Sequence, residues 1–168
     1  PEYYNGADIS FDEKGYAQMS AKTYIKNVTE RIEKLLECTL KNYGSPMDPG
    51  DHPELDDSDL LPQQEVAIYQ MLIGCAQWAV TLGRFDIQYA TNTLARYASM
   101  PREGHLNRCY RLFGYMKYHS KGRLVFDPTN PVLNEEDFQS HDWTDIYPNP
   151  QEYIPDDIPE PKTSHPLA

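Results

Sequence analysis

Hydrophobic residues recur at helical spacing in four stretches of the chain. In residues 21–37 the apolar side chains fall on one face, whose members are Tyr24, Ile25, Val28, Ile32, Leu35 and Leu36. Residues 63–82 are apolar on nearly every side, which is typical of a helix at the centre of a core. Apolar spacings of three and four also predict helices over residues 87–99 and 103–119.

Strand patterns occur at both ends of this helical region. The opening "YYNGADISF" is rich in aromatic and β-branched residues and is followed by "DEKG" and "YAQMS". This pattern predicts a β-hairpin over residues 3–19, with Gly15 supplying a positive φ in the turn. "RLVF" at residues 123–126 predicts a short strand. The expected fold class is therefore α+β and mainly helical, and Ser20 and Asp86 are expected to cap the first and third helices.

Two segments have no such periodicity. Residues 44–62, "GSPMDPGDHPELDDSDLLP", predict an extended acidic loop. Residues 127–168 contain eight prolines and ten acidic residues, which predicts an extended tether on which Trp143 and Tyr147 would dock only locally. The expected organisation is a folded part over residues 1–126 followed by an acidic, proline-rich connector.

Composition restricts the classes of protein that fit. The three cysteines, Cys38, Cys75 and Cys109, are odd in number and widely spaced, so neither a disulfide framework nor a zinc module is indicated. The chain has no apolar run of about 20 residues and no basic N-terminal region before an apolar stretch. We therefore expect an intracellular protein without a signal peptide or transmembrane segment. The chain does not begin with Met, which suggests a piece of a longer polypeptide.

Charge is distributed unevenly along the 168 residues, whose net charge is -11. Residues 46–65 hold seven acids and no base, whereas residues 81–124 hold eight Lys or Arg and two acids. Within this basic block a stripe at helical spacing consists of Arg108, Arg111, Tyr115 and Tyr118. Arginine binds phosphate with two hydrogen bonds and tyrosine packs on sugars or bases, so the stripe suits a nucleic-acid backbone. A plain solvated basic face is the alternative.

Other candidate chemistry is weaker. Asp86 in "GRFDI" fits a helix cap better than a catalytic acid. His105 and Cys109 are four residues apart and would share a metal ion only with a third ligand, which the sequence does not indicate. The "DDSD" at residues 56–59 lacks the glycine and terminal Glu of a calcium loop. The sequence contains no nucleophile with a base and no phosphate-binding glycine loop, and no cofactor is predicted.

The order of several motifs resembles the C-terminal part of a copia-type LTR-retrotransposon reverse transcriptase. These motifs are "YYNGADIS", "YIKNVTERI", "YGSPMD" and the block from "YQMLIGCAQWAV" through "GRFDIQYA" to "GYMKYHSKGRLVF". The resemblance covers residues 3–126 and is strongest in residues 69–118. The tail "HDWTDIYPNPQEYIPDDIPEPK" is similar to the connector that precedes the RNase H domain in a subgroup of these elements.

The resemblance implies a role in holding template and primer. In that family the palm aspartates that hold Mg²⁺ precede such a segment and the RNase H carboxylates follow it. Tyr4 and Gly6 match the primer-grip strand, with Asn5 in place of the usual Leu. Arg84 belongs to "RFDI", which matches an "RPDI" element with Phe in place of Pro, and Arg108 and Arg111 match the following helix, together with His105.

Two functions remain as alternatives. The first is a non-catalytic segment of an RNA-directed DNA polymerase that contacts an RNA/DNA template-primer duplex by its backbone. Its partners would be the palm and RNase H parts of the parent polyprotein, in the cytoplasm or a virus-like particle. The second is a decayed or repurposed retroelement fragment that acts as a helical protein-interaction module. No membrane partner is expected.

Overall fold

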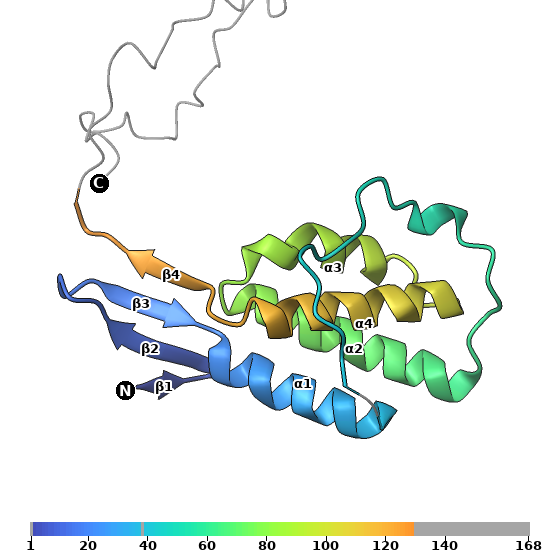
Figure 1. Ribbon diagram of the computed structural model, residues 1–168, viewed down its shortest axis with the longest axis horizontal. Coiled ribbons are helices and arrows are strands. Elements are labelled where there is room, and N and C mark those ends of the chain that lie inside the picture. Colours follow the sequence, from blue (N-terminus) through green and yellow to red (C-terminus); the bar gives the residue numbers. More distant parts are fainter. Residues whose placement is uncertain (1, 38, 130–168) are drawn as a thin grey trace, which may run out of the picture. The chain divides into compact units, whose positions relative to one another are not determined.

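The computed structural model describes residues 2–37 and 39–129 (Figure 1). Its α-helices are α1 (Lys22–Leu36), α2 (Gln63–Thr81), α3 (Gln88–Ala95) and α4 (Glu103–Tyr118). Its strands are β1 (Tyr3–Tyr4), β2 (Ala7–Phe11), β3 (Ala17–Ser20) and β4 (Arg123–Phe126), and two 3-10 turns are η1 (Pro53–Leu55) and η2 (Phe85–Ile87). The expected fold class, α+β and mainly helical with an N-terminal hairpin, is confirmed.

The four strands form one antiparallel sheet in the order β1-β2-β3-β4. The predicted strand at residues 123–126 is confirmed, and it pairs with β3, where Leu124 lies opposite Met19. The last strand of the described chain thus joins the sheet that the N-terminal strands form. This pairing joins strands about a hundred residues apart, which no local pattern predicts.

The sheet contains one turn that the sequence pattern did not predict. The sequence pattern placed "YYNGADISF" in one strand, but Tyr4 pairs with Ala7 across a two-residue turn. Asn5 has φ of 50° and Gly6 has φ of 95°, and positive φ at both positions is what a type I′ turn requires. The second turn follows the prediction, since Gly15 has φ of 83° between β2 and β3.

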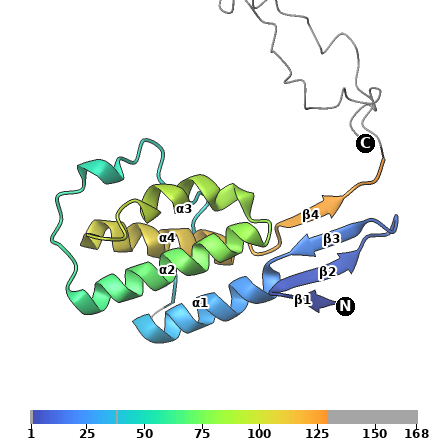
Figure 2. The same ribbon diagram turned by 180° about the vertical axis from the view of Figure 1, so that it is seen from behind.

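Helix α2 lies at the centre of the helical core, as its composition predicts. Tyr69, Leu72 and Ala76 are completely buried, and the Tyr69 hydroxyl donates a hydrogen bond of 2.7 Å to the carbonyl of Leu94 in α3. Figures 1 and 2 show α1, α2 and α4 side by side, with the sheet at the end where α1 begins and α4 ends. The other side of α2 is exposed at Met71 and Trp78.

Neither predicted helix cap forms. Ser20 belongs to β3, and α1 begins after Ala21, whose side chain has no capping group. The carboxylate of Asp8 in β2 instead accepts a hydrogen bond of 2.8 Å from the backbone N–H of Thr23. Helix α3 begins after Ile87 without a side-chain cap, because the Asp86 carboxylate is engaged elsewhere. It also ends at Ala95, four residues before its predicted end.

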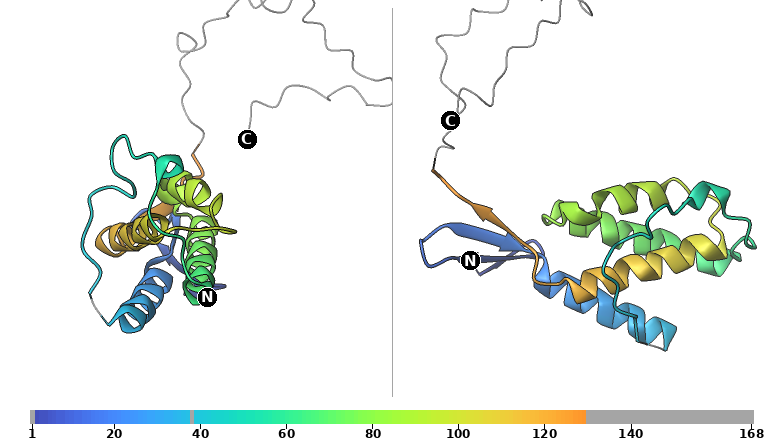
Figure 3. Two further views of the ribbon diagram at one scale, coloured as in Figure 1. Left: turned by 90° about the vertical axis from the view of Figure 1, so that its right-hand side faces the viewer. Right: turned by 45° about the horizontal axis from the view of Figure 1, so that its top comes forward.

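The acidic loop predicted for residues 44–62 passes across α4 and then leads into α2 (Figures 1 and 3). All of the helices and strands named above belong to one unit, Pro1–Asp127. The expected extended tether, with Trp143 and Tyr147, lies outside the described residues. Among the helices of the described part, none combines the length and apolarity that crossing a bilayer requires.

Candidate nucleic-acid interface

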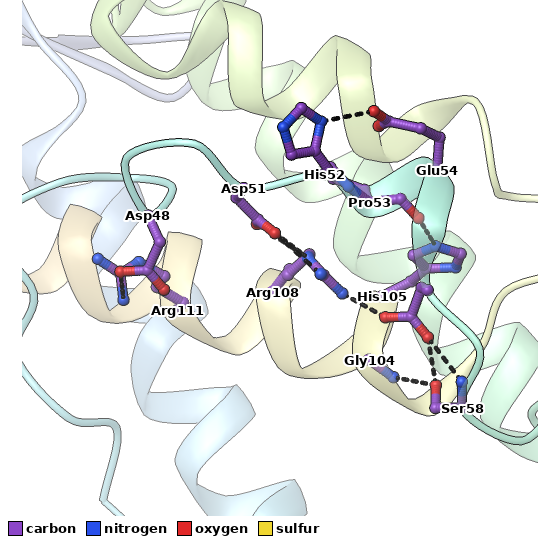
Figure 4. Close-up of polar contacts among 11 residues, drawn as sticks. Asp48, Asp51, His52, Pro53, Glu54, Ser58, Gly104, His105, Arg108 and Arg111 are labelled. Carbon is purple, nitrogen blue, oxygen red and sulfur yellow. Dashed lines mark hydrogen bonds and ion pairs between the residues drawn. The ribbon is translucent and has the colours of Figure 1, made fainter.

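The acidic loop neutralises Arg108 of α4. Its Nε lies 2.9 Å and its Nη2 also 2.9 Å from carboxylate oxygens of Asp51, while Nη1 donates to Asp56 (Figure 4). The hydrogen bonds that Arg108 donates to Asp51, and after them those to Asp56, raise the pKa of Arg108 although burial opposes them. Only 23% of the side chain is exposed. The guanidinium therefore has no open bidentate face for a phosphate.

Arg111, one helical turn further along α4, is engaged by the same loop. Its Nη1 lies 2.8 Å from Asp48 (Figure 4). Its Nη2 donates to the hydroxyl of Ser45 at 3.1 Å. Its guanidinium carbon also lies 4.5 Å from the centre of the Tyr43 ring. The expectation of an open basic stripe is thus wrong for both arginines. The acidic loop supplies the counter-charges, and the pairing joins residues too far apart in sequence for a pattern to indicate it.

The loop is anchored at the first turn of α4 as well. The Asp56 carboxylate accepts a hydrogen bond of 3.1 Å from the backbone N–H of Ser58, whose hydroxyl accepts one of 2.9 Å from the N–H of Gly104 (Figure 4). Burial would raise the pKa of Asp56, but hydrogen bonds from Ser58 and Arg108 outweigh it and lower the pKa. A Cβ at Gly104 would overlap the Asp56 carboxylate, so this close approach requires glycine. Asp56 is therefore a specific anchor rather than a merely solvated charge.

His105 also fastens the loop, and it does not form a metal pair with Cys109. Its Nδ1 accepts a hydrogen bond of 3.1 Å from the N–H of Arg102, and its Nε2 lies 2.9 Å from the carbonyl of Pro53, to which it donates. Its ring stacks on Tyr97 with 4.0 Å between centres. Burial raises the pKa of the Cys109 thiol to about 12. Within residues 2–37 and 39–129, no three His, Cys, Asp or Glu side chains come together at a metal-binding distance.

Arg84, which is buried, and Asp86, whose side chain is 39% exposed, form a clamp beside the C-terminal half of α4. Arg84 is 3% exposed and donates from Nε and Nη2 to the two oxygens of Asp86, at 2.8 and 2.7 Å. Tyr115 donates its hydroxyl to the same carboxylate at 3.0 Å. Burial would raise the pKa of Asp86, but the bonds from Arg84 and Tyr115 lower it. Arg84 and Tyr115 were both expected to contact nucleic acid. In the structure both donate hydrogen bonds to the same carboxylate, that of Asp86.

An open hollow lies above this clamp, where α4 ends and β4 begins. Its volume is about 770 Å³, and its lining includes Arg84, Phe85, Tyr115, Tyr118, Lys121 and Arg123. We call it the aromatic hollow, because Phe85 is 58% and Tyr118 is 59% exposed. Of the residues in the predicted stripe, Tyr118 alone keeps most of its side chain in solvent.

A second hollow of about 470 Å³ lies on the polar face of the sheet. Its lining includes Asp8, Gln18, Ser20, Lys22, Lys121 and Arg123, and we call it the polar hollow. Lys121 and Arg123 line both hollows, and both side chains are exposed. Sequence reasoning missed them, although "HSKGR" directly follows the basic helix. Their position became clear only when β4 paired with β3.

Tyr4 and Gly6, the residues matched to a primer grip, lie at the β1–β2 turn. Tyr4 is 69% exposed. A Cβ at Gly6 would lie 3.1 Å from Nε1 of Trp78 and 3.3 Å from Cδ1 of Leu82, so the close approach here is between the turn and α2. The reason for glycine in this structure is packing within the protein, together with the positive φ of the turn.

Comparison of the chain with protein-family models, with curated proteins and with solved structures found no match in any of the three.

Proposed function

We propose that this chain is a non-catalytic segment of a retrotransposon RNA-directed DNA polymerase that holds an RNA/DNA template-primer duplex by its phosphates. The resemblance of its motifs to the C-terminal part of copia-type reverse transcriptases supplies the class of function. One structural observation carries the proposal: Lys121 and Arg123 are exposed between two hollows. Among the described residues, neither side chain has an ion pair.

The nearby acids leave the local charge positive. Asp86 is neutralised by Arg84, and an oxygen of Asp8 is engaged by the backbone of Thr23. Lys22 adds a further exposed cation to the polar hollow. Cations without a carboxylate partner gain the most from a polyanion, because binding releases the counterions condensed on the phosphates. The phosphate contacts therefore lie at the α4–β4 junction rather than along Arg108 and Arg111.

Contacts of this kind position a duplex without reading its sequence. Nucleotidyl transfer would be performed by the palm of the parent polyprotein, with Mg²⁺ bound there, and RNA cleavage by its RNase H part. The segment's partners are then the duplex and those two parts. Under this proposal it works inside the cell, in the cytoplasm or in a virus-like particle.

The test is the salt dependence of duplex binding by the 168-residue chain. A labelled RNA/DNA duplex is titrated by fluorescence anisotropy between 50 and 200 mM NaCl, with wild type and with the double variant Lys121→Gln, Arg123→Gln. Each lost phosphate contact lowers the slope of log K against log salt by about 0.9, so the variant should lose about two units. The matched control is Arg31→Gln, Lys34→Gln, which removes the same two charges from the exposed face of α1.

Variants of the two arginines that the acidic loop contacts separate this proposal from the expectation of phosphate binding along α4. Arg108→Gln and Arg111→Gln should leave the slope unchanged, because both arginines already have carboxylate partners. An equal slope for wild type and for the Lys121, Arg123 double variant would contradict the proposal.

The exposed apolar side of α2 favours the second function, a helical protein-interaction module. Met71 is 48% and Trp78 is 39% exposed on this helix, and Tyr89 at the start of α3 is 78% exposed. Exposed apolar patches of this kind often mark contact sites between proteins. If this function is correct, wild type should not bind the duplex. The Trp78→Arg variant should lose association of the chain with its partner or with itself, as measured by sedimentation velocity.

A further inference from the structure

The aromatic hollow has features that a phosphate grip does not use. Phosphate contacts need cations and N–H donors, yet this hollow presents the largely exposed rings of Phe85 and Tyr118. Burying such rings is favourable, so leaving them in solvent beside two cations is costly without a ligand. The volume of about 770 Å³ lies within the range of about 300–1,000 Å³ that small-molecule sites occupy.

We propose that the aromatic hollow takes an unpaired nucleotide, with its base packed against both Phe85 and Tyr118 and its phosphate held by Lys121 and Arg123. The ligand class is single-stranded nucleic acid, such as the unpaired template beyond a primer. This inference rests on the proposed function, because it assigns a second part of the same nucleic acid to the same junction.

Exposed rings select unpaired bases for a geometric reason. In a duplex each base is stacked on both faces, so no face is free to pack against a side chain, whereas a single strand offers every base face. Base–aromatic stacking is also tolerant of sequence, because all bases have a π-face. An acidic peptide would satisfy Lys121 and Arg123 but would leave the two rings exposed. The combination of rings and cations therefore favours single-stranded nucleic acid.

The side chains at the floor of the hollow already contact one another without a ligand. Arg84 and Tyr115 both bind the Asp86 carboxylate, and the guanidinium carbon of Arg84 lies 5.9 Å from the centre of the Tyr115 ring. The His119 ring lies between Tyr115 and Tyr118, with ring centres 4.7 and 4.8 Å away. The His119 ring supports one side of the Tyr118 ring, which lowers the conformational entropy lost when a base packs against it.

The experiment compares three ligands of the full chain: a blunt RNA/DNA duplex, the same duplex with a template overhang, and the overhang sequence as a single strand. Anisotropy titrations at fixed salt use wild type, Phe85→Ala and Tyr118→Ala. Each variant should weaken binding of the single strand and of the overhang ligand by about tenfold, the loss expected for one stacked base. Binding of the blunt duplex should not change.

Two further variants control for trivial effects. Phe11→Ala removes a phenylalanine that is 71% exposed on β2 and does not line the hollow, so it should bind every ligand as wild type does. Tyr118→Phe keeps the ring and should retain single-strand affinity, which separates stacking from loss of the hydroxyl. Circular dichroism melting establishes that each variant is folded.

The outcomes separate this inference from the proposed function. Equal losses for the blunt duplex and the single strand, or no loss for either, would overturn the inference while duplex binding by Lys121 and Arg123 stands. Poly-glutamate, added at the same concentration of negative charge as the single strand, should not displace it. Displacement would also overturn the inference, because poly-glutamate has no aromatic base to pack against Phe85 and Tyr118. Failure of wild type to bind any of the three ligands would overturn both.

Discussion

Two glycines at interior positions of helices should respond in opposite directions to substitution by alanine. Gly114 lies in α4 and is buried beneath the segment that leads into the acidic loop. A Cβ there would overlap the backbone carbonyl of Lys41 and would lie 2.9 Å from a ring carbon of Tyr43. Gly74 lies in α2, is exposed, and has open space where a Cβ would stand.

The magnitudes follow from two competing terms. Replacing glycine by alanine inside a helix favours folding by about 1 kcal/mol. At Gly74 this term acts alone, so Gly74→Ala should raise the free energy of unfolding by about 0.5–1 kcal/mol. At Gly114 the obstacle is backbone, so the chain at Lys41 must shift, and such overpacking costs about 1–3 kcal/mol. The Tyr43 ring would also lose its packing on Arg111. Because the obstacle is a backbone carbonyl that the Cβ would overlap, the cost lies toward the upper end of the overpacking range, at about 2–3 kcal/mol. Gly114→Ala should therefore lower the free energy of unfolding by about 1–2 kcal/mol, giving a gap of about 1.5–3 kcal/mol between the two variants.

Urea unfolding of the full chain, followed by circular dichroism at the helical band, measures both variants against wild type. The midpoints should move in opposite directions with similar m-values, because the surface exposed on unfolding hardly changes. If Gly114→Ala is stabilised as much as Gly74→Ala, the segment around Lys41 does not pack on α4, and the seating of the acidic loop on Arg108 and Arg111 is refuted with it.

Two other predictions concern single ionisable groups. The pKa of Asp56 is lower in the folded chain than in the unfolded one, so its stabilising contribution is present above about pH 4 and is lost as pH falls through its folded pKa. In wild type the free energy of unfolding, measured with urea, should therefore fall as pH is lowered from about 5, and Asp56→Asn should make this fall smaller. The control is Asp57→Asn, which changes an exposed neighbour outside these hydrogen bonds and should behave as wild type does. The same fall in all three proteins would contradict this reasoning. Burial raises the pKa of the Cys109 thiol to about 12, so iodoacetamide at pH 8 should modify Cys109 only under unfolding conditions. Peptide mass mapping measures the modification. Rapid modification of Cys109 in the native protein would show that α4 opens readily.

The alkylation of Cys109 also separates local from global opening. Since the thiol lies on the buried face of α4, its modification rate at low urea reports how often that helix leaves the core. A variant that displaces the acidic loop, such as Gly114→Ala, should increase this rate.

Much of the secondary structure follows from local spacing. The apolar faces predict all four helices to within a few residues, and the strand at residues 123–126 and the positive φ of Gly15 also agree with prediction. The main local error was the Asn5–Gly6 turn, although Asn-Gly is the strongest short signal for a hairpin. The two cap errors have a tertiary origin. Asp8 reaches α1 from a neighbouring strand, and Asp86 is drawn away by Arg84 and Tyr115.

The chain's own periodicity and composition establish the α+β class, the central place of α2 and the concentration of basic residues in one block, because each depends on residues within a few turns of one another. Contacts between distant segments decide which of those basic residues stay accessible to a ligand. The acidic loop neutralises Arg108 and Arg111 across more than fifty positions, and the pairing of β4 with β3 leaves Lys121 and Arg123 between two hollows. Charge in a sequence is a local property, whereas its availability to a ligand depends on which oppositely charged groups the fold brings beside it.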